Sequence, residues 1–227
     1  MALPEFDYAD IYDESRTRMV ATAQTLSAGD LATPTPTCPG WTVHDVYAHL
    51  SGLCVDVVVD EVSRPGSEQA TARQVADRRE WSLTDILHEW DVHASAMGAL
   101  LREHGRGLTR LAIDMWSHEQ DAHNALSLES GRTGQGLEVT VNGVWRLKRA
   151  LRDAGIPPLR IVTEHRDWVL GDEAPGRTLR ISDYELARAT LGRRSRRQLR
   201  NYAWDGDPAP YLALLPIFGP AGEDIIE

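Results

Sequence analysis

The chain is organised around residues 111–126, which read LAIDMWSHEQDAHNAL. This stretch concentrates potential metal ligands and proton carriers within about four helical turns. Residues four apart lie on one face of a helix, with about 5–6 Å between their Cβ atoms. Two carboxylate–histidine pairs have this spacing, Asp114 with His118 and Glu119 with His123. Either pair can supply two ligands to a divalent ion such as zinc.

The spacing alone leaves a second interpretation open. Surface helices often carry Glu and His, so a solvated polar stripe explains the same pattern. The face with Asp114 and His118 also holds Leu111, Met115 and Ala122, so it mixes apolar residues with one carboxylate and one imidazole. Helical bundles commonly build metal sites from the inward side chains of such faces.

Hydrophobic periodicity predicts four amphipathic helices in the first part of the chain. Their expected ranges are residues 7–28, a helix that begins after Thr42, 83–103 and 108–127. Asp45 lies three residues after Thr42, which is close to a capping box, and Ser82 is placed to cap the third helix. Gly29-Asp30 should end the first helix, the proline-rich residues 33–40 should run extended, and residues 63–82 should form a loop with a short helix, a possible active-site cover. Four helices with short breaks predict a bundle over residues 1–130.

One histidine falls on the apolar stripe of the second helix. His49 lies between Val46 and Leu53, in the pattern that Val43, Leu50 and Val57 continue. A histidine in such a place is usually a neutral core residue held by hydrogen bonds.

After residues 130–136, which read SGRTGQG, the character of the sequence changes. The pattern of residues 137–227 predicts a small α+β domain. Its expected elements are a helix over 139–154, strands at 159–163, 167–170 and 178–181, a helix over 184–191, the basic run 192–200, and a helix that starts at residues 205–208 and leads into 211–215.

Composition limits the kinds of partner. The chain has 227 residues with 42% hydrophobic and 26% charged residues, and its net charge is −10. This acidic balance argues against nucleic acid or an anionic membrane as the main partner. No apolar run is long enough to span a bilayer, and residues 1–7 do not read as a signal peptide. Only two cysteines are present, and Cys54 lies in an apolar run, so a reducing cytoplasm and a core position for Cys54 are expected.

Four stretches of the sequence carry a family resemblance. Residues 38–50, CPGWTVHDVYAHL, resemble the start of helix 2 in the DinB-like, mycothiol-dependent maleylpyruvate isomerase family of actinobacteria. Residues 116–121, WSHEQD, are similar to the second motif of that family, an aromatic residue followed by His-x-x-Asp. Residues 191–199, LGRRSRRQL, and 204–208, WDGDP, are similar to its C-terminal domain, which is related to sterol-carrier folds. The resemblance spans nearly the whole chain.

The resemblance implies a divalent metal, zinc first and nickel or iron next. By motif position its ligands are His49, Asp114 and His118. The His118-x-x-Asp121 spacing sets this registration. It leaves Asp121 to orient the imidazole of His118 or to close the helix end, and a simply solvated Asp121 is the alternative. The chain departs from the family at Asp114, where Glu is more common, and the side chain is one methylene shorter.

The resemblance also implies mycothiol or a similar thiol as cosubstrate. Two imidazoles and one carboxylate leave a fourth position of the metal open. A thiol that binds there becomes a thiolate near neutral pH and attacks a small electrophile, so the protein needs no reactive cysteine of its own. The expected activity is that of a metal-dependent isomerase or transferase in the cytoplasm, working as a monomer or homodimer.

Two questions stay open from the sequence. The arginines Arg193, Arg194, Arg197 and Arg78 could bind a carboxylate of the thiol or substrate, or simply be solvated. The alternatives to the thiol-dependent enzyme are a non-catalytic small-molecule-binding protein that retains the bundle, and a metal-dependent hydrolase with water in the open position.

Overall fold

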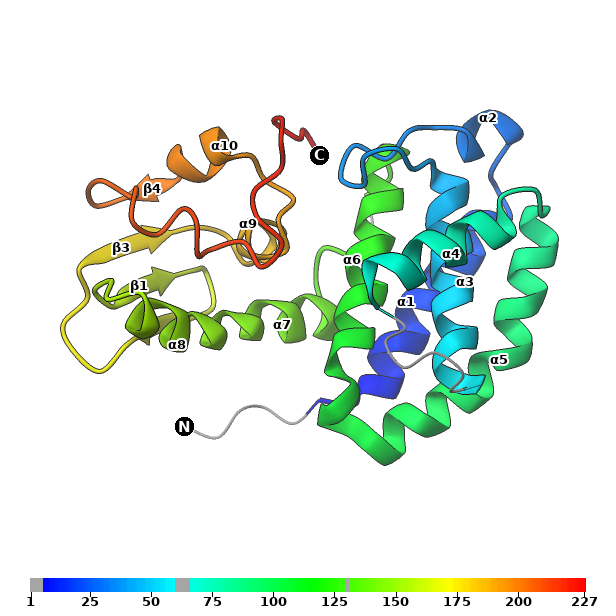
Figure 1. The fold of residues 1–227 in the computed structure, drawn as a ribbon, viewed down its shortest axis with the longest axis horizontal. Coiled ribbons are helices and arrows are strands. Elements are labelled where there is room, and N and C mark those ends of the chain that lie inside the picture. The colour runs from blue at the N-terminus through cyan, green and yellow to red at the C-terminus, as the bar shows by residue number, and fades with distance from the viewer. Residues whose placement is uncertain (1–5, 60–65, 130) are drawn as a thin grey trace. The chain divides into compact units, whose positions relative to one another are not determined.

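The computed structural model describes residues 6–59, 66–129 and 131–227. The chain divides into two compact units, with the boundary between Gly131 and Arg132. The first unit is helical, and the second combines helices with a four-stranded sheet (Figure 1). The predicted α+β class, with a helical bundle followed by a small α+β part, is confirmed. None of the helices in the described ranges combines the length and the apolar character that a bilayer crossing requires.

Four long helices form the N-terminal unit, as the periodicity predicts. They are α1 (Tyr8–Ala23), α3 (Val43–Val59), α5 (Leu83–His104) and α6 (Thr109–Ala125), with the shorter α2 (Ala28–Leu31), α4 (Glu68–Arg78) and a 3₁₀ turn at Gly105–Leu108. Helix α3 packs against α4, α5 and α6, and α1 packs against α5 and α6. The two helices with the predicted metal ligands, α3 and α6, are therefore neighbours.

Local capping explains where these helices begin and end. The Thr42 backbone N–H donates to Asp45 Oδ2 (2.9 Å) and the Asp45 N–H to Thr42 Oγ1 (3.3 Å), so the capping pair predicted before α3 is present. Ser82 caps α5 by accepting from the Asp85 N–H, as predicted. Helix α5 ends where Gly105 adopts a φ of 41°, a left-handed value that favours glycine.

The first helix is shorter than predicted. It ends at Ala23 rather than near residue 28, and Gly29-Asp30 lies inside α2 instead of ending α1. The reason is a capping box, in which the Ser27 hydroxyl accepts from the Asp30 N–H while the Asp30 carboxylate accepts from the Ser27 N–H. This reciprocal pair starts a new helix, which competes with continuation of the old one.

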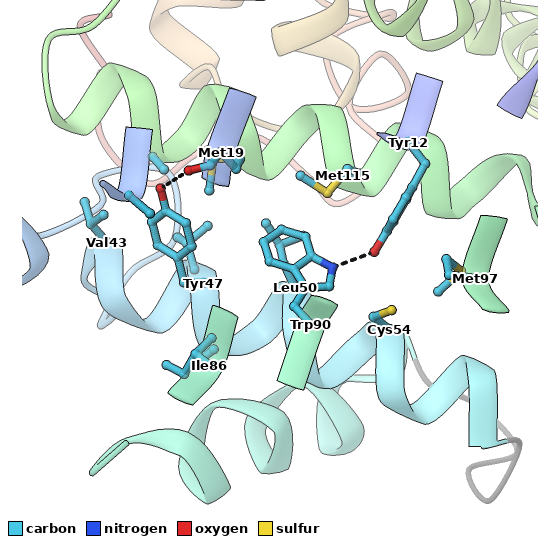
Figure 2. Packing of buried hydrophobic residues seen from close by; sticks show 14 of the residues in the cluster. Tyr12, Met19, Val43, Tyr47, Leu50, Cys54, Ile86, Trp90, Met97 and Met115 are labelled. Atoms are coloured by element: carbon cyan, nitrogen blue, oxygen red, sulfur yellow. Dashed lines mark hydrogen bonds between the residues drawn. The ribbon is translucent and has the colours of Figure 1, made fainter. Parts of the chain in front are cut away.

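The core of the bundle holds aromatic residues whose polar ends are paired (Figure 2). The Tyr47 hydroxyl donates to the Met19 carbonyl, and the Trp90 Nε1–H donates to the Tyr12 hydroxyl, each at 2.9 Å. Cys54 is fully buried among them, as predicted, and burial raises the pKa of its thiol to about 11. The hydroxyl of Tyr47 and the indole N–H of Trp90 are thus buried in the core with their hydrogen bonds satisfied.

The C-terminal unit is a small mixed sheet with helices. Its elements are α7 (Gln135–Asn142), a 3₁₀ turn at Gly143–Trp145, α8 (Arg146–Asp153), β1 (Leu159–Val162), β2 (Asp167–Leu170), β3 (Arg177–Arg180), α9 (Asp183–Thr190), α10 (Arg196–Arg200) and β4 (Ala203–Trp204). The strand order is β2-β1-β3-β4, with β1 and β3 parallel and the outer strands antiparallel to their neighbours. Alternate residues such as Leu159 and Ile161 are buried, which gives the sheet its apolar face.

Two predictions in this unit need correction. The helix predicted over 139–154 is split into α7 and α8 by the 3₁₀ turn. The helix predicted from residue 205 is absent from the described chain, because Asp205 accepts a hydrogen bond from the Thr178 N–H and β4 pairs with β3 just before it. Three parts of these predictions lie outside the described residues: residues 1–5, within the stretch predicted not to be a signal peptide, residues 63–65 of the predicted loop, and residue 130 of the stretch where the character of the sequence changes.

Candidate metal centre

Three side chains from two helices converge in the N-terminal unit. They are His49 from α3, and Asp114 and His118 from α6. Nε2 of His49 lies 3.3 Å from Oδ2 of Asp114, and Nε2 of His118 lies 3.7 Å from Oδ1. One ligand atom from each residue falls within 4.8 Å of the others. The fold therefore brings together the three residues that the resemblance implies as metal ligands.

These three groups differ in exposure. His49 is 3% exposed because it lies on the apolar stripe of α3, and the His118 side chain is 10% exposed. The Asp114 side chain, one turn before His118 on α6, is 36% exposed. The centre is thus anchored by buried imidazoles and reached from solvent on the side of the carboxylate.

Asp121 holds the far side of the His118 ring. Its Oδ2 lies 3.0 Å from His118 Nδ1, and the carboxylate is buried. An ionised carboxylate only accepts hydrogen bonds, so the Nδ1 atom carries a proton, and in the neutral imidazole Nε2 then keeps its lone pair. The lone pair points to the Asp114 side of the ring, as a metal ligand requires.

Gln74 of α4 contacts the corresponding nitrogen of His49. Its Oε1 lies 2.9 Å from His49 Nδ1, and the Gln74 side chain is fully buried. The sequence interpretation did not identify Gln74. A usable signal is its place in the series Ala70, Gln74, Arg78, whose members recur every four residues and are all buried on one face of α4.

The donor set of the centre fits a cation. Nε2 of each ring lies toward the Asp114 carboxylate, so a neutral imidazole with its proton on Nδ1 directs its Nε2 lone pair there. Such electron-rich atoms repel one another unless a proton or a metal ion lies among them. Two imidazole nitrogens and one carboxylate oxygen form a ligand set typical of catalytic zinc, which keeps a fourth position for water or substrate.

Trp41 covers the imidazoles. Its ring centroid is 5.2 Å from that of His49 and 5.8 Å from that of His118, on which it stacks at 24°. The two imidazoles meet edge to face at 4.8 Å. The indole therefore forms an aromatic wall that restricts the orientation of both rings.

Cys38 lies just outside the predicted ligand set. Its Sγ is 3.4 Å from Asp121 Oδ2 and 3.8 Å from His118 Nδ1, and the residue is partly exposed. Cys38, His118 and Asp121 form a second group with ligand atoms within 4.8 Å of one another. The sequence interpretation assigned Cys38 no role, although it opens the motif CPGWT that also contributes Trp41.

The competing pair on α6 lies on another face of that helix. Glu119 and His123 are both buried and face α1, where Arg18 donates to both Glu119 carboxylate oxygens and Thr22 Oγ1 lies 3.0 Å from His123 Nε2. The guanidinium already neutralises the Glu119 carboxylate. This pair is therefore part of the packing between α1 and α6.

A third group of potential ligands lies in the C-terminal unit. Glu164, His165 and Asp183 gather at the start of α9, where Glu164 accepts from the Asp183 N–H and His165 Nδ1 lies 2.8 Å from Asp183 Oδ2. Helix N-termini favour anions, so these carboxylates are explained by capping of α9.

Each arginine with a predicted role in binding has a hydrogen-bond or ion-pair partner within its own unit. Arg78 of α4 donates to both carboxylate oxygens of Glu89. In the C-terminal unit Arg194 pairs with Glu185 and Glu227, Arg197 pairs with Asp224, and Arg193 donates to the Leu191 carbonyl. Burial acts to lower the pKa of Arg194, but the hydrogen bonds and charges of its two glutamates outweigh it and raise that pKa. Binding of a thiol or substrate by these arginines stays a prediction.

The chain is similar to known proteins in sequence and in fold. Residues 12–123 match the family described as the mycothiol maleylpyruvate isomerase N-terminal domain. Two crystal structures of the mycothiol-dependent maleylpyruvate isomerase, one of them of a mutant, resemble the chain with a TM-score of 0.51 at 12% sequence identity. Each comparison covers 84% of this chain and 90% of the other chain. The comparison with curated proteins returned no match. At this identity the crystal structures show a shared fold.

Proposed function

Because residues 12–123 belong to the family of mycothiol maleylpyruvate isomerase N-terminal domains, we propose that this protein is a metal- and thiol-dependent enzyme. Its cosubstrate is mycothiol or a similar low-molecular-weight thiol, and it either isomerises a small electrophile or transfers the thiol to it, in the cytoplasm of an actinobacterium. The observation that carries the proposal is the meeting of two Nε2 atoms and one carboxylate at a partly open position.

In this proposal His49, Asp114 and His118 hold a divalent ion, with zinc the first candidate. A bound ion of this kind lowers the pKa of a thiol at its open position and so makes a nucleophile near neutral pH. The side chain of Asp114 is one methylene shorter than glutamate, but its two oxygens already lie 3.3 and 3.7 Å from the two imidazoles. The shorter residue is therefore compatible with the ligand set.

The residues around these ligands bind the two imidazoles and orient them. Asp121 orients His118 through Nδ1, Gln74 contacts Nδ1 of His49, and Trp41 packs against both rings from one side. Thiol and electrophile approach from the side of Asp114, where the centre is exposed. In an isomerisation the thiolate adds to an activated double bond, rotation follows about the resulting single bond, and the thiolate leaves again with its electron pair.

The first test compares two buried histidines of the same helix. We expect the wild-type chain, purified without a tag or chelator, to contain about one zinc, nickel or iron per chain, because open zinc sites use three protein ligands. His118→Ala should lose the metal, and the matched control His123→Ala should keep it. Metal content measured by mass spectrometry decides the outcome, and loss in His123→Ala with retention in His118→Ala would contradict the ligand assignment.

The second part of the test concerns the thiol. In cobalt-substituted protein, mycothiol should produce a thiolate-to-metal charge-transfer band that is absent in His118→Ala. A metal-loaded protein without this band at saturating thiol would favour the metal-dependent hydrolase. A chain that refuses zinc altogether would favour the non-catalytic binding protein.

A further inference from the structure

Helix α4 reaches the candidate metal centre from outside the ligand set, through a chain of polar contacts. The His49 Nδ1 atom meets Gln74 Oε1 at 2.9 Å, and Gln74 Nε2 donates to Asp56 Oδ2 at 2.6 Å. Arg73, adjacent to Gln74, donates from Nη2 to both Asp56 oxygens at 2.7 Å. The chain runs from the solvent edge, where Arg73 is 45% exposed, to a histidine that is 3% exposed.

The chemistry of each link determines the direction of the hydrogen bonds. Asp56 is ion-paired with Arg73, and the pKa of Arg73 is raised by its hydrogen bond to this carboxylate. A carboxylate accepts only, so the Gln74 amide must turn its NH₂ group to Asp56. Its carbonyl oxygen then faces His49 and accepts only, so the proton of the neutral imidazole must lie on Nδ1.

The close approach of α4 to α3 depends on a glycine. A Cβ atom at Gly52 would lie 2.7 Å from Arg78 Nη1 and 2.8 Å from Gln74 Cβ, which is too close for any side chain. Arg78 Nη1 also donates to the Gln74 carbonyl at 3.1 Å, while the rest of its guanidinium binds Glu89 of α5. Both the backbone and the side chain of Gln74 are therefore held in place. Arg78 binds its carbonyl oxygen, and His49 and Asp56 contact its side-chain amide.

We propose that Gln74 is a positioning residue that selects the Nδ1–H tautomer of His49, so that Nε2 is presented to the metal. The ion pair between Arg73 and Asp56 sets the orientation of the Gln74 amide. This inference rests on the proposed metal-dependent function, but the tautomer is a property of the metal-free protein. Helix α4, expected from the sequence as a possible cover, thus acts on the centre through His49.

The test uses Gln74→Met, which keeps the volume of the side chain and removes its hydrogen bonds. Nitrogen-15 NMR of the metal-free full-length chain reports the tautomer of neutral His49, and zinc titration by calorimetry reports affinity. We expect wild-type His49 to carry its proton on Nδ1 and Gln74→Met to populate the Nε2–H form. Zinc affinity should fall by about 10–100-fold, the usual effect of losing the partner of a ligand histidine.

Two further variants separate positioning from folding. Gln120→Met is the matched control, because Gln120 is equally buried on α6 and its amide has no hydrogen-bond partner in the described structure. Its zinc affinity and its His49 tautomer should be those of wild type. Asp56→Asn leaves Gln74 in place but removes the carboxylate that orients its amide, so it should also raise the fraction of the Nε2–H form.

The outcomes are distinguishable. A folded Gln74→Met chain with unchanged zinc affinity and an unchanged Nδ1–H tautomer would overturn the inference. If Gln74→Met fails to fold, the tautomer of His49 in Asp56→Asn decides. A His49 tautomer in that variant like that of wild type would overturn the inference. Failure of the proposed function is a different result, namely a wild-type chain that has the Nδ1–H tautomer and binds no zinc.

Discussion

His123 is a buried histidine of α6 that lies away from the candidate metal centre. Its Nε2 lies 3.0 Å from Thr22 Oγ1, while its Nδ1 is buried without a hydrogen-bond partner in the described structure. Burial lowers the pKa of His123, the charge of Arg18 acts in the same direction, and Glu119 opposes them. The imidazole is therefore kept neutral in the folded protein.

This residue predicts a pH dependence of stability. The unfolded histidine takes up a proton as the pH falls below about 6.5, whereas the folded one does not until its lowered pKa is reached. Stability present at neutral pH is therefore lost as the pH falls through this window, by up to about 1.4 kcal/mol per pH unit. The free energy of unfolding, measured with urea at pH 5 and at pH 7, should differ less between the two pH values in His123→Gln than in wild type. The exposed His88→Gln is the control, and equal pH differences in all three proteins would contradict the prediction.

At the scale of the helices, one buried hydrogen bond joins α1 to α5. Trp90 Nε1 donates to the Tyr12 hydroxyl at 2.9 Å, and both side chains are in the core (Figure 2). Burial is the main cause that raises the pKa of Tyr12 well above its usual value, so the hydroxyl stays neutral. Trp is donor only, so this hydroxyl is what satisfies its N–H in the core.

We therefore expect Tyr12→Phe to destabilise the protein by about 1–3 kcal/mol, because it leaves the Trp90 N–H buried and unpaired. Tyr8→Phe, on the same helix, leaves that bond intact and should cost less than about 0.5 kcal/mol. Equilibrium urea unfolding measures both variants. Equal stabilities of Tyr12→Phe and Tyr8→Phe would show that the buried N–H finds another partner.

At the scale of the whole molecule, the ligands and their supporting residues belong to one unit. His49, Gln74, Asp114, His118 and Asp121 all precede the boundary at Gly131. The Gly131 carbonyl accepts a hydrogen bond from Trp116 Nε1 at 2.9 Å, so Gly131 is part of the packing around α6.

A fragment that ends at Gly131 should consequently fold and bind zinc with an affinity within about threefold of the full chain, a change of less than 1 kcal/mol. Circular dichroism establishes the fold, and calorimetric titration with zinc measures the affinity. A helical fragment that binds zinc more than tenfold more weakly would show that residues 132–227 contribute to the centre.

The sequence by itself determined the helices of the bundle and the α+β class. The reason is that helix starts and periodicity depend on residues a few positions apart, such as Thr42 with Asp45. The pairing of Asp114 with His118 on one face follows from the same local rule. The errors at Ala23 and after Asp205 arose where a competing cap or a strand contact replaced the expected pattern.

Only the tertiary structure decided what surrounds these ligands. The two carboxylate–histidine pairs of α6 are equivalent by spacing, and they differ because one faces α3 and the other meets Arg18 of α1. Gln74 reaches the centre from α4, and Cys38 and Trp41 reach it from the segment before α3, so no helical periodicity connects them to the ligands. Contacts between residues far apart in sequence depend on helix packing, and local patterns carry no information about which faces will meet.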